Sequence, residues 1–258
     1  MALITFMSDM GLQDHYVASV KANILQVNPS AQIIDISHNI EPFNLAQAAF
    51  LLKATVKNFP SGSIHLYTVD STGKINEKFI AAELEGHFFV GNDNGLLGLI
   101  SERIADKIVK LPDNETISSF PEKNILSKAA AALSMNIPLE TLGTPLSEYN
   151  RKLSRQMRVT KNQISGHVIY VDHYGNLITN IEKDAFLKIK KDRNYMVTFG
   201  RESLDKIYMS YQFVDDGDCV AIFNDLNVLE LAINKGNAKE LLGLSYDSPV
   251  SITFNPEL

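Results

Sequence analysis

Short apolar runs alternate with longer helical patterns over the first seventy residues, and this alternation restricts the possible folds most. The apolar runs cover residues 2–7, 32–37 and 63–69, and each has the length of a buried strand. Between them, residues 14–27 and 45–58 carry apolar side chains at helical spacing, and a proline follows each segment. Strands that alternate with helices in this way predict βαβ units and a mostly parallel sheet.

The next part of the chain predicts a reversal of direction. Residues 79–84 and 87–90 flank a Glu-Gly pair, which is typical of a β-hairpin. Residues 92–95 read Asn-Asp-Asn-Gly and predict a tight turn, because glycine tolerates a positive φ. An alanine-rich segment at 128–135 predicts a further helix.

The character of the sequence changes at residues 151–162, a polar and basic segment that we interpret as a linker. Residues 1–150 before it form the predicted α/β N-terminal domain. Residues 163–258 after it contain one short helical pattern, at 237–242, among several strand-like runs. They predict a small β-rich C-terminal domain, a barrel or a sandwich. The strand-like runs are residues 163–171, 196–199, 218–223, 228–231 and 249–254.

Charge and cysteine content argue against several classes of protein. The chain has 24 basic and 30 acidic side chains without a strong basic cluster, so we expect no nucleic-acid partner. The single cysteine, Cys219, lies in an apolar run and is expected to be a small buried hydrophobe. The six histidines are dispersed, so we expect no metal site. No apolar run approaches the roughly 20 residues that span a bilayer, and no signal peptide is evident, which favours a cytoplasmic protein without a membrane partner.

Aspartates at the ends of predicted strands are the first candidates for a functional site. Asp9, Asp70 and Asp172 each follow an apolar run. Ligands of parallel α/β sheets bind beyond the carboxyl ends of the strands, and a carboxylate there needs a cation or hydrogen-bond donors. The alternative for each aspartate is that it accepts N–H bonds within its own turn. Glycine-rich phosphate-binding motifs and a Gly-x-Ser-x-Gly elbow are absent from the sequence.

Residues 170–181 form a more specific pattern, because they combine a carboxylate, an aromatic ring, a glycine turn and two amides. Asn176 and Asn180 can each donate and accept hydrogen bonds, which suits contact with the edge of a nucleobase. Tyr174 can stack on a base. The alternative, a hairpin turn, explains Gly175 and Asn176 but not the whole pattern.

Five segments of the chain resemble the S-adenosylmethionine (SAM) hydroxide adenosyltransferase family, whose relatives include the fluorinases and chlorinases. The family opens with Thr-Asp-Phe-Gly-x-x-Asp-x-Tyr-Val and carries Asp-x-Phe-Gly-Asn-x-x-Thr-Asn-Ile in its second half. This chain looks like a divergent member, in which the matching segments follow the family order at residues 8–17, 35–38, 92–97, 172–181 and 229–238.

The resemblance implies an α/β N-terminal domain joined to a β-barrel C-terminal domain, and a homotrimer that binds a small adenosyl ligand between subunits. It implies that Asp9 holds the ribose hydroxyls, that Tyr174 and Asn176 hold the adenine, and that Asp172 faces the methionine ammonium. In the family, water or halide attacks the ribose C5′ and methionine leaves. The hydrolases form adenosine and need no cofactor.

The resemblance also assigns a catalytic role to Asp70, as one member of an Asp-Arg-His set that manages the water. Glu77 stands in place of the family's arginine, and Pro121 in place of its histidine. A glutamate repels an attacking hydroxide that an arginine would favour, and proline cannot relay a proton. The family's Asn-Ser-x-Gly turn corresponds to residues 224–227, where Asp225 is a further expected substrate contact.

Three hypotheses about function follow from these residues. The first is an enzyme that cleaves SAM to adenosine and methionine, or that uses another nucleophile. The second is an adenosyl- or nucleoside-binding protein that has lost hydrolysis because Glu77 and Pro121 replace the family's residues. The third is a structural scaffold without a ligand. Turnover that disappears on Asp70→Ala would support the first, and binding without turnover would support the second.

Overall fold

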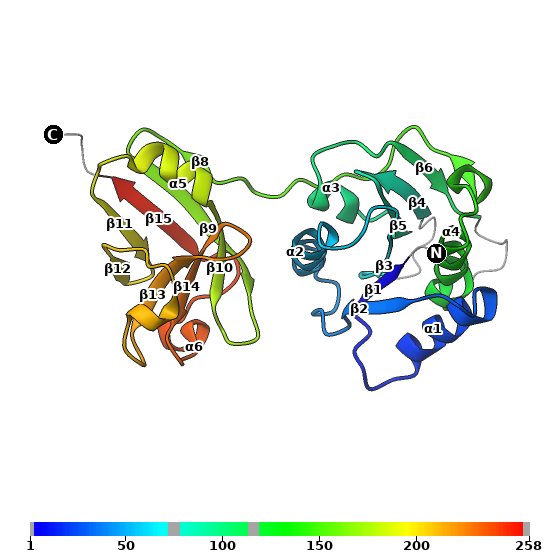
Figure 1. Cartoon of the computed structure of the whole chain (residues 1–258), viewed down its shortest axis with the longest axis horizontal. Helices are drawn as coiled ribbons and strands as arrows, with labels where there is room; N and C mark the ends of the chain where they lie inside the picture. Colours follow the sequence, from blue (N-terminus) through cyan, green and yellow to red (C-terminus); the bar gives the residue numbers. More distant parts are fainter. Residues whose placement is uncertain (1–2, 72–77, 113–118, 255–258) are drawn as a thin grey trace. The chain divides into compact units, whose positions relative to one another are not determined.

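The chain divides into two compact units (Figure 1). The first unit is Met1–Ser154 and the second is Arg155–Leu258, so the boundary falls within the segment interpreted as a linker. Part of that segment forms a short strand, β8 (Arg158–Val159). The computed structural model describes residues 3–71, 78–112 and 119–254.

The N-terminal unit is built on a seven-stranded sheet in the order β2-β1-β3-β5-β4-β6-β7. The pairings among β2, β1, β3 and β5 are parallel, and those among β5, β4, β6 and β7 are antiparallel. The sheet is therefore mixed, and the expectation of a mostly parallel sheet is not confirmed. The strands are β1 (Ile4–Ser8), β2 (Ile33–Ser37), β3 (Ile64–Thr68), β4 (Phe79–Leu84), β5 (His87–Asn92), β6 (Lys107–Lys110) and β7 (Thr144–Pro145).

The predicted hairpin explains why the sheet is mixed. Strands β4 and β5 pair antiparallel around Glu85 and Gly86, both of which have a positive φ. Strand β5 also pairs in parallel with β3, so the hairpin joins the parallel half of the sheet to the antiparallel half. Strand β6 then pairs antiparallel with the free edge of β4.

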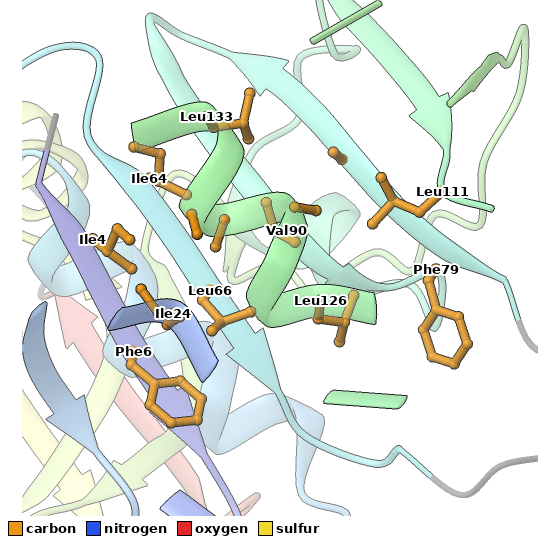
Figure 2. Packing of buried hydrophobic residues seen from close by; sticks show 14 of the residues in the cluster. Ile4, Phe6, Ile24, Ile64, Leu66, Phe79, Val90, Leu111, Leu126 and Leu133 are labelled. Carbon is orange, nitrogen blue, oxygen red and sulfur yellow. The ribbon is translucent and has the colours of Figure 1, made fainter. Parts of the chain in front are cut away.

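Helices cover both faces of this sheet. Helices α1 (Tyr16–Val27) and α4 (Ser127–Ser134) contribute to one buried cluster, part of which is shown in Figure 2. Helices α2 (Leu45–Val56) and α3 (Leu96–Ile100) contribute to the cluster on the other face. In β1, Ile4 and Phe6 belong to the first cluster and Met7 to the second, as the alternation of side chains in a strand requires.

The sequence determines local details of these helices. Helix α2 begins after Asn44, whose side-chain oxygen accepts a hydrogen bond from the Gln47 amide at 3.0 Å. Its buried residues Leu45, Ala48 and Leu52 recur at helical spacing. Helix α4 follows directly on a π-helix, Glu122–Leu126, which the sequence analysis did not predict.

The C-terminal unit is an eight-stranded sheet in the order β12-β11-β15-β9-β10-β14-β13, with β8 paired to β9. The sheet is nearly barrel-shaped, because the Tyr208 amide, beyond β12, donates to the Ala221 carbonyl of β13 at 2.8 Å. Its core is a separate cluster of buried residues that includes Phe199, Leu231 and Ile252. The remaining strands are β9 (Gln163–Val171), β10 (Leu177–Glu182), β11 (Tyr195–Phe199), β12 (Glu202–Leu204), β13 (Cys219–Phe223), β14 (Val228–Ile233) and β15 (Pro249–Phe254).

Two helices accompany this sheet. Helix α6 (Ala238–Leu242) coincides with the predicted helical pattern, whereas α5 (Lys183–Lys190) was not predicted. Over the ranges that the structure describes, none of the helices in either unit combines the length and apolar character needed to cross a bilayer.

Candidate functional site

The predicted site residues fall into two groups, one in each unit. Asp9 and Asp70 belong to the N-terminal unit, at the carboxyl ends of β1 and β3. These strands are parallel neighbours in which Ser8 pairs with Thr68, so both aspartates lie at the same edge of the sheet. Asp172, Tyr174 and Asn176 belong to the C-terminal unit.

The carboxylate of Asp9 ties together three segments of the N-terminal unit. Its Oδ2 accepts the backbone amides of Phe43 at 2.9 Å and Asp70 at 3.1 Å. Both donors have a positive φ, 67° for Phe43 and 54° for Asp70, a conformation that costs energy in residues other than glycine. Its Oδ1 accepts no hydrogen bond from the described residues and is available to a ligand.

A row of polar contacts supports the strand end before Asp9. The Ser8 hydroxyl lies 2.7 Å from His38 Nδ1, and His38 Nε2 lies 3.1 Å from Asp35 Oδ1. Because the carboxylate can only accept, we assign the ring proton to Nε2, and the Ser8 hydroxyl then donates to Nδ1. Burial lowers the pKa of His38 although the nearby Asp35 carboxylate opposes the shift, so the ring is neutral near pH 7. Residue His38 therefore has a supporting position beneath Asp9.

Asp70 is half-buried, and two buried hydroxyls lie close to it in the sequence. Oγ1 of Thr68 and Oγ of Ser71 have no hydrogen-bond partner among the described residues. Buried hydroxyls of this kind commonly bind ordered water or a ligand atom. These two hydroxyls are therefore candidate contacts for water or for a polar ligand beside Asp70.

Of the two residues that replace the family's arginine and histidine, Glu77 and Pro121, the structure describes only Pro121. Glu77 lies outside the described residues. Pro121 is buried and immediately precedes the π-helix. The neighbouring Phe120 ring makes an edge contact with Tyr16 of α1, with 5.5 Å between ring centroids. Pro121 itself offers an apolar ring and no group that could transfer a proton.

In the C-terminal unit, Asp172 closes the turn between β9 and β10. Its Oδ1 accepts the amides of Tyr174 at 2.9 Å and Asn176 at 2.8 Å, and its Oδ2 accepts Asn176 Nδ2 at 2.9 Å. The carboxylate therefore has the turn-closing role considered as the alternative in the sequence analysis. It also faces an open hollow, so contact with a ligand ammonium stays a prediction.

This turn presents two groups to the hollow. Tyr174 has 74% of its surface exposed, and its ring makes only an edge contact with His173 among the described residues. Asn176 is 8% exposed and is oriented by its bond to Asp172. Gly175 has a φ of 85°, and a Cβ there would lie 2.0 Å from Asn237 Oδ1. The turn thus requires glycine for its conformation and for close packing.

The hollow beside this turn has a volume of about 640 Å³. That size is within the range of small-molecule sites. Its walls come from the β9–β10 turn, from the segment 233–237 after β14, and from two side chains that the sequence analysis did not single out as site residues, Tyr211 and Glu230. The lining residues are Asp172, Tyr174, Asn176, Tyr211, Glu230, Ile233, Asn234, Lys235, Gly236 and Asn237.

Glu230 and Tyr211 form a hydrogen-bonded polar pair in the lining of the hollow. Glu230 is 5% exposed and accepts hydrogen bonds from the Tyr211 hydroxyl and, at 3.1 Å, from Asn224 Nδ2. Burial, together with the hydrogen bond to Glu230 and its charge, raises the pKa of Tyr211, so the phenol stays protonated at neutral pH. Glu230 belongs to the segment 229–238, which resembles the family, so this resemblance could have indicated Glu230 as a site residue.

Asp225 does not line the hollow. It is exposed in the turn between β13 and β14, and its neighbour Asn224 makes the link to Glu230 instead. The structure therefore brings Asp172, Tyr174 and Asn176 together around one hollow and places Asp225 outside that lining.

A mixed α/β unit and a nearly closed β unit, with carboxylates at strand ends and a hollow that exposes an aromatic ring, define a two-domain protein suited to a small polar ligand. Family models agree with this division. The SAM hydroxide adenosyltransferase N-terminal domain matches residues 4–143, and the C-terminal domain of the same family matches residues 166–251. The chain therefore belongs to the SAM hydroxide adenosyltransferase family.

Individual relatives match over nearly their full length. The chain is 28% identical to an (R)-S-adenosyl-L-methionine hydrolase of Methanocaldococcus jannaschii, over 98% of this chain and 96% of that protein. It is also 28% identical to the hydrolase of the same name from Thermus thermophilus, over 96% and 98% of the two chains. An uncharacterized conserved protein from Thermotoga maritima has a similar structure, with a TM-score of 0.89 and 32% identity over 97% of this chain and 100% of that one.

Proposed function

We propose that this protein is a SAM hydrolase that forms adenosine and methionine. The observation that carries the proposal is the match of both family domains, in order, to a chain whose C-terminal hollow exposes Tyr174 beside an oriented Asn176. Hydrolases of this name are among the chain's full-length relatives. Stacking on Tyr174 and hydrogen bonds from Asn176 suit an adenine ring.

In the proposed reaction, the oxygen of a water molecule attacks the ribose C5′ and the C5′–S bond breaks. The bonding electron pair goes to sulfur, so the sulfonium leaves as the neutral thioether of methionine, and the water gives up a proton to Asp70 or to solvent. Oδ1 of Asp9, which accepts no hydrogen bond within the described part of the chain, would accept hydrogen bonds from the ribose hydroxyls. No cofactor is proposed, because the positive charge on sulfur already makes methionine a good leaving group.

Pro121 favours a second candidate, an adenosyl-binding protein without hydrolysis. A buried pyrrolidine ring cannot accept or deliver a proton. With proline at residue 121, the proposed reaction would depend on Asp70 alone for proton transfer. The two candidates share the ligand and differ in turnover.

We also propose a cytoplasmic location and a homotrimeric assembly. In the homotrimer, Asp9 and Asp70 of one subunit would meet the C-terminal hollow of a neighbour. The assembly is supported by exposed apolar side chains in both units. Leu12 and Phe43 are 65% and 63% exposed in the N-terminal unit, and Met209 and Phe213 are 91% and 55% exposed in the C-terminal unit. Light scattering should give three times the chain mass of 28.7 kDa, and a monomer would contradict the proposed assembly.

Calorimetric titration with adenosine and SAM, together with chromatography of the products, tests the function. The wild type should bind both ligands and release adenosine from SAM. Tyr174→Ala should weaken adenosine binding about tenfold, the value of one lost base-stacking contact. Tyr246→Ala removes another ring, 54% exposed, that does not line the hollow, and should bind normally. Binding without adenosine release would favour the second candidate, and no binding would contradict both.

A further inference from the structure

A second hollow lies on the C-terminal unit. Its volume is about 460 Å³, and strands β8, β9, β11 and β15 form its floor. None of its lining residues lines the first hollow. They are Arg155, Gln156, Arg158, Ser165, Gly166, His167, Thr198, Phe199, Gly200, Pro249, Val250 and Ser251.

Strand register places a row of hydrogen-bonding side chains across this floor. Arg158 pairs with Ser165, Ser165 with Ser251, and Ser251 with Thr198. Residues directly opposite one another in antiparallel strands project from the same face. Their neighbour Ile164 is fully buried in the core, so the row projects outward from the barrel. One guanidinium and three hydroxyls thus line up across four strands.

His167 adds a buried polar group to this hollow. It follows Ser165 at the next outward position of β9, is only 4% exposed, and its ring makes no hydrogen bond with the described residues. Burial and the nearby Arg155 charge lower the pKa of His167, with Asp247 opposing the shift, so the ring is neutral at pH 7. A neutral imidazole can donate or accept one hydrogen bond at each nitrogen.

The charge of the lining is opposite to that of the chain. The chain carries a formal net charge of −6, whereas the lining contains two arginines and no carboxylate. Arg155 donates to Asp247 at 2.6 Å, so half of this positive charge is compensated. Arg158 makes no ion pair with the described residues, and its guanidinium is available to an anion.

We propose that this hollow binds the phosphate group of a small hydroxylated molecule of the sugar phosphate class. The planar guanidinium of Arg158 matches a phosphate with two parallel hydrogen bonds. Strands are spaced about 4.8 Å apart, so the three hydroxyls extend over about 10 Å, which is longer than a phosphate group. The row therefore offers contacts to the hydroxyls of the molecule that carries the phosphate.

Calorimetric titration of the full chain with ribose 5-phosphate and with inorganic phosphate, in a phosphate-free buffer at constant ionic strength, tests this site. Ribose 5-phosphate should bind, and inorganic phosphate should bind more weakly. Arg158→Gln should weaken ribose 5-phosphate about tenfold or more, the value of a charge-assisted bidentate contact. Ser251→Ala should weaken ribose 5-phosphate but not inorganic phosphate. Arg158 is exposed, so its substitution leaves the fold intact, which circular dichroism would verify.

Lys188→Gln is the matched control, because it removes one exposed positive charge from α5, outside the lining. It should bind ribose 5-phosphate as the wild type does. An equal loss in Lys188→Gln and Arg158→Gln would overturn the proposal, because it would show a general charge effect. Absence of binding, or equal affinity for both probes, would also overturn it.

Discussion

Asp9 accepts hydrogen bonds from two strained backbone positions with Oδ2, whereas its Oδ1 accepts none from the residues that the structure describes. The amides of Phe43 and Asp70 come from different loops, and both residues adopt a positive φ. Without an acceptor, each would lose the hydrogen bond that offsets part of this strain. A ribose contact through Oδ1 would therefore act on a carboxylate that is already immobilised, which reduces the entropic cost of binding.

Asp9→Ala should accordingly affect both stability and binding. We expect a loss of about 1–3 kcal/mol in the free energy of unfolding, because two amides lose a charged acceptor. Adenosine affinity should fall at least tenfold. Denaturant unfolding and calorimetry measure the two effects. Asp106→Ala, at an exposed aspartate away from these loops, should change neither. An unchanged adenosine affinity in Asp9→Ala would contradict the predicted ribose contact.

His65 should make the N-terminal unit sensitive to acid. It is fully buried, bonded to Thr5 Oγ1 at 2.8 Å and close to His87, and burial followed by the His87 charge lowers its pKa to about 3. In the unfolded state His65 binds a proton near pH 6.5, whereas in the folded state it does not. The contribution of neutral His65 to the free energy of unfolding is therefore fully present above pH 6.5 and decreases as the pH falls towards 3.

For His65 alone, the linkage predicts a loss of about 2 kcal/mol in the free energy of unfolding between pH 7.5 and pH 5. Denaturant unfolding at a series of pH values measures it. His65→Gln should reduce the slope, whereas His173→Gln, at an exposed histidine, should retain the wild-type slope. A wild-type slope in His65→Gln would show that other groups cause the sensitivity.

At the scale of elements, the β9–β10 turn depends on a glycine for two separate reasons. Gly175 and Gly217 both have a positive φ, of 85° and 90°, but only Gly175 lies against another side chain, Asn237, which caps α6. Gly217→Ala should therefore introduce conformational strain alone. Gly175→Ala should add a steric clash that displaces Asn237.

We expect Gly175→Ala to lower the free energy of unfolding by about 1–3 kcal/mol more than Gly217→Ala does, in line with the cost of overpacking. It should also weaken adenosine binding, because Gly175 lies between Tyr174 and Asn176. Thermal unfolding and calorimetry of the two variants provide the comparison. Equal effects on both properties would show that packing against Asn237 does not contribute.

Elements with a strong local pattern were predictable from the sequence. Strands β9 and β15 and the β4–β5 hairpin coincide with the predicted segments, because apolar runs and turn residues define them locally. Helix α5 was missed because four of its eight residues are charged and only Phe186 is buried. The mixed order of the first sheet depends on pairings between distant segments, which no local pattern specifies.

The same distinction applies to the site. The sequence pattern indicated Asp172, Tyr174 and Asn176, and the structure places them around one hollow. The sequence pattern could not indicate that Asp172 would accept three hydrogen bonds from its own turn, or that Asp9 would accept a hydrogen bond from the amide of Phe43. These contacts depend on backbone conformations that become fixed only when the chain folds.

At the scale of the whole molecule, the family and the two-unit architecture agree, while the residues expected to manage the water differ from the family pattern. The central claim is that water attacks the ribose C5′ of SAM despite Pro121. If Asp70 is the remaining catalytic group, turnover is expected to be slow and to disappear in Asp70→Asn, while SAM binding persists.

Mass spectrometry of the products formed from SAM in isotopically labelled water tests this claim most directly. Adenosine and methionine should form in equal amounts, and the 5′ hydroxyl of adenosine should carry the labelled oxygen. Asp70→Asn should form neither product above the uncatalysed background. Intact SAM in the presence of the wild type, or adenosine without the label, would contradict the claim.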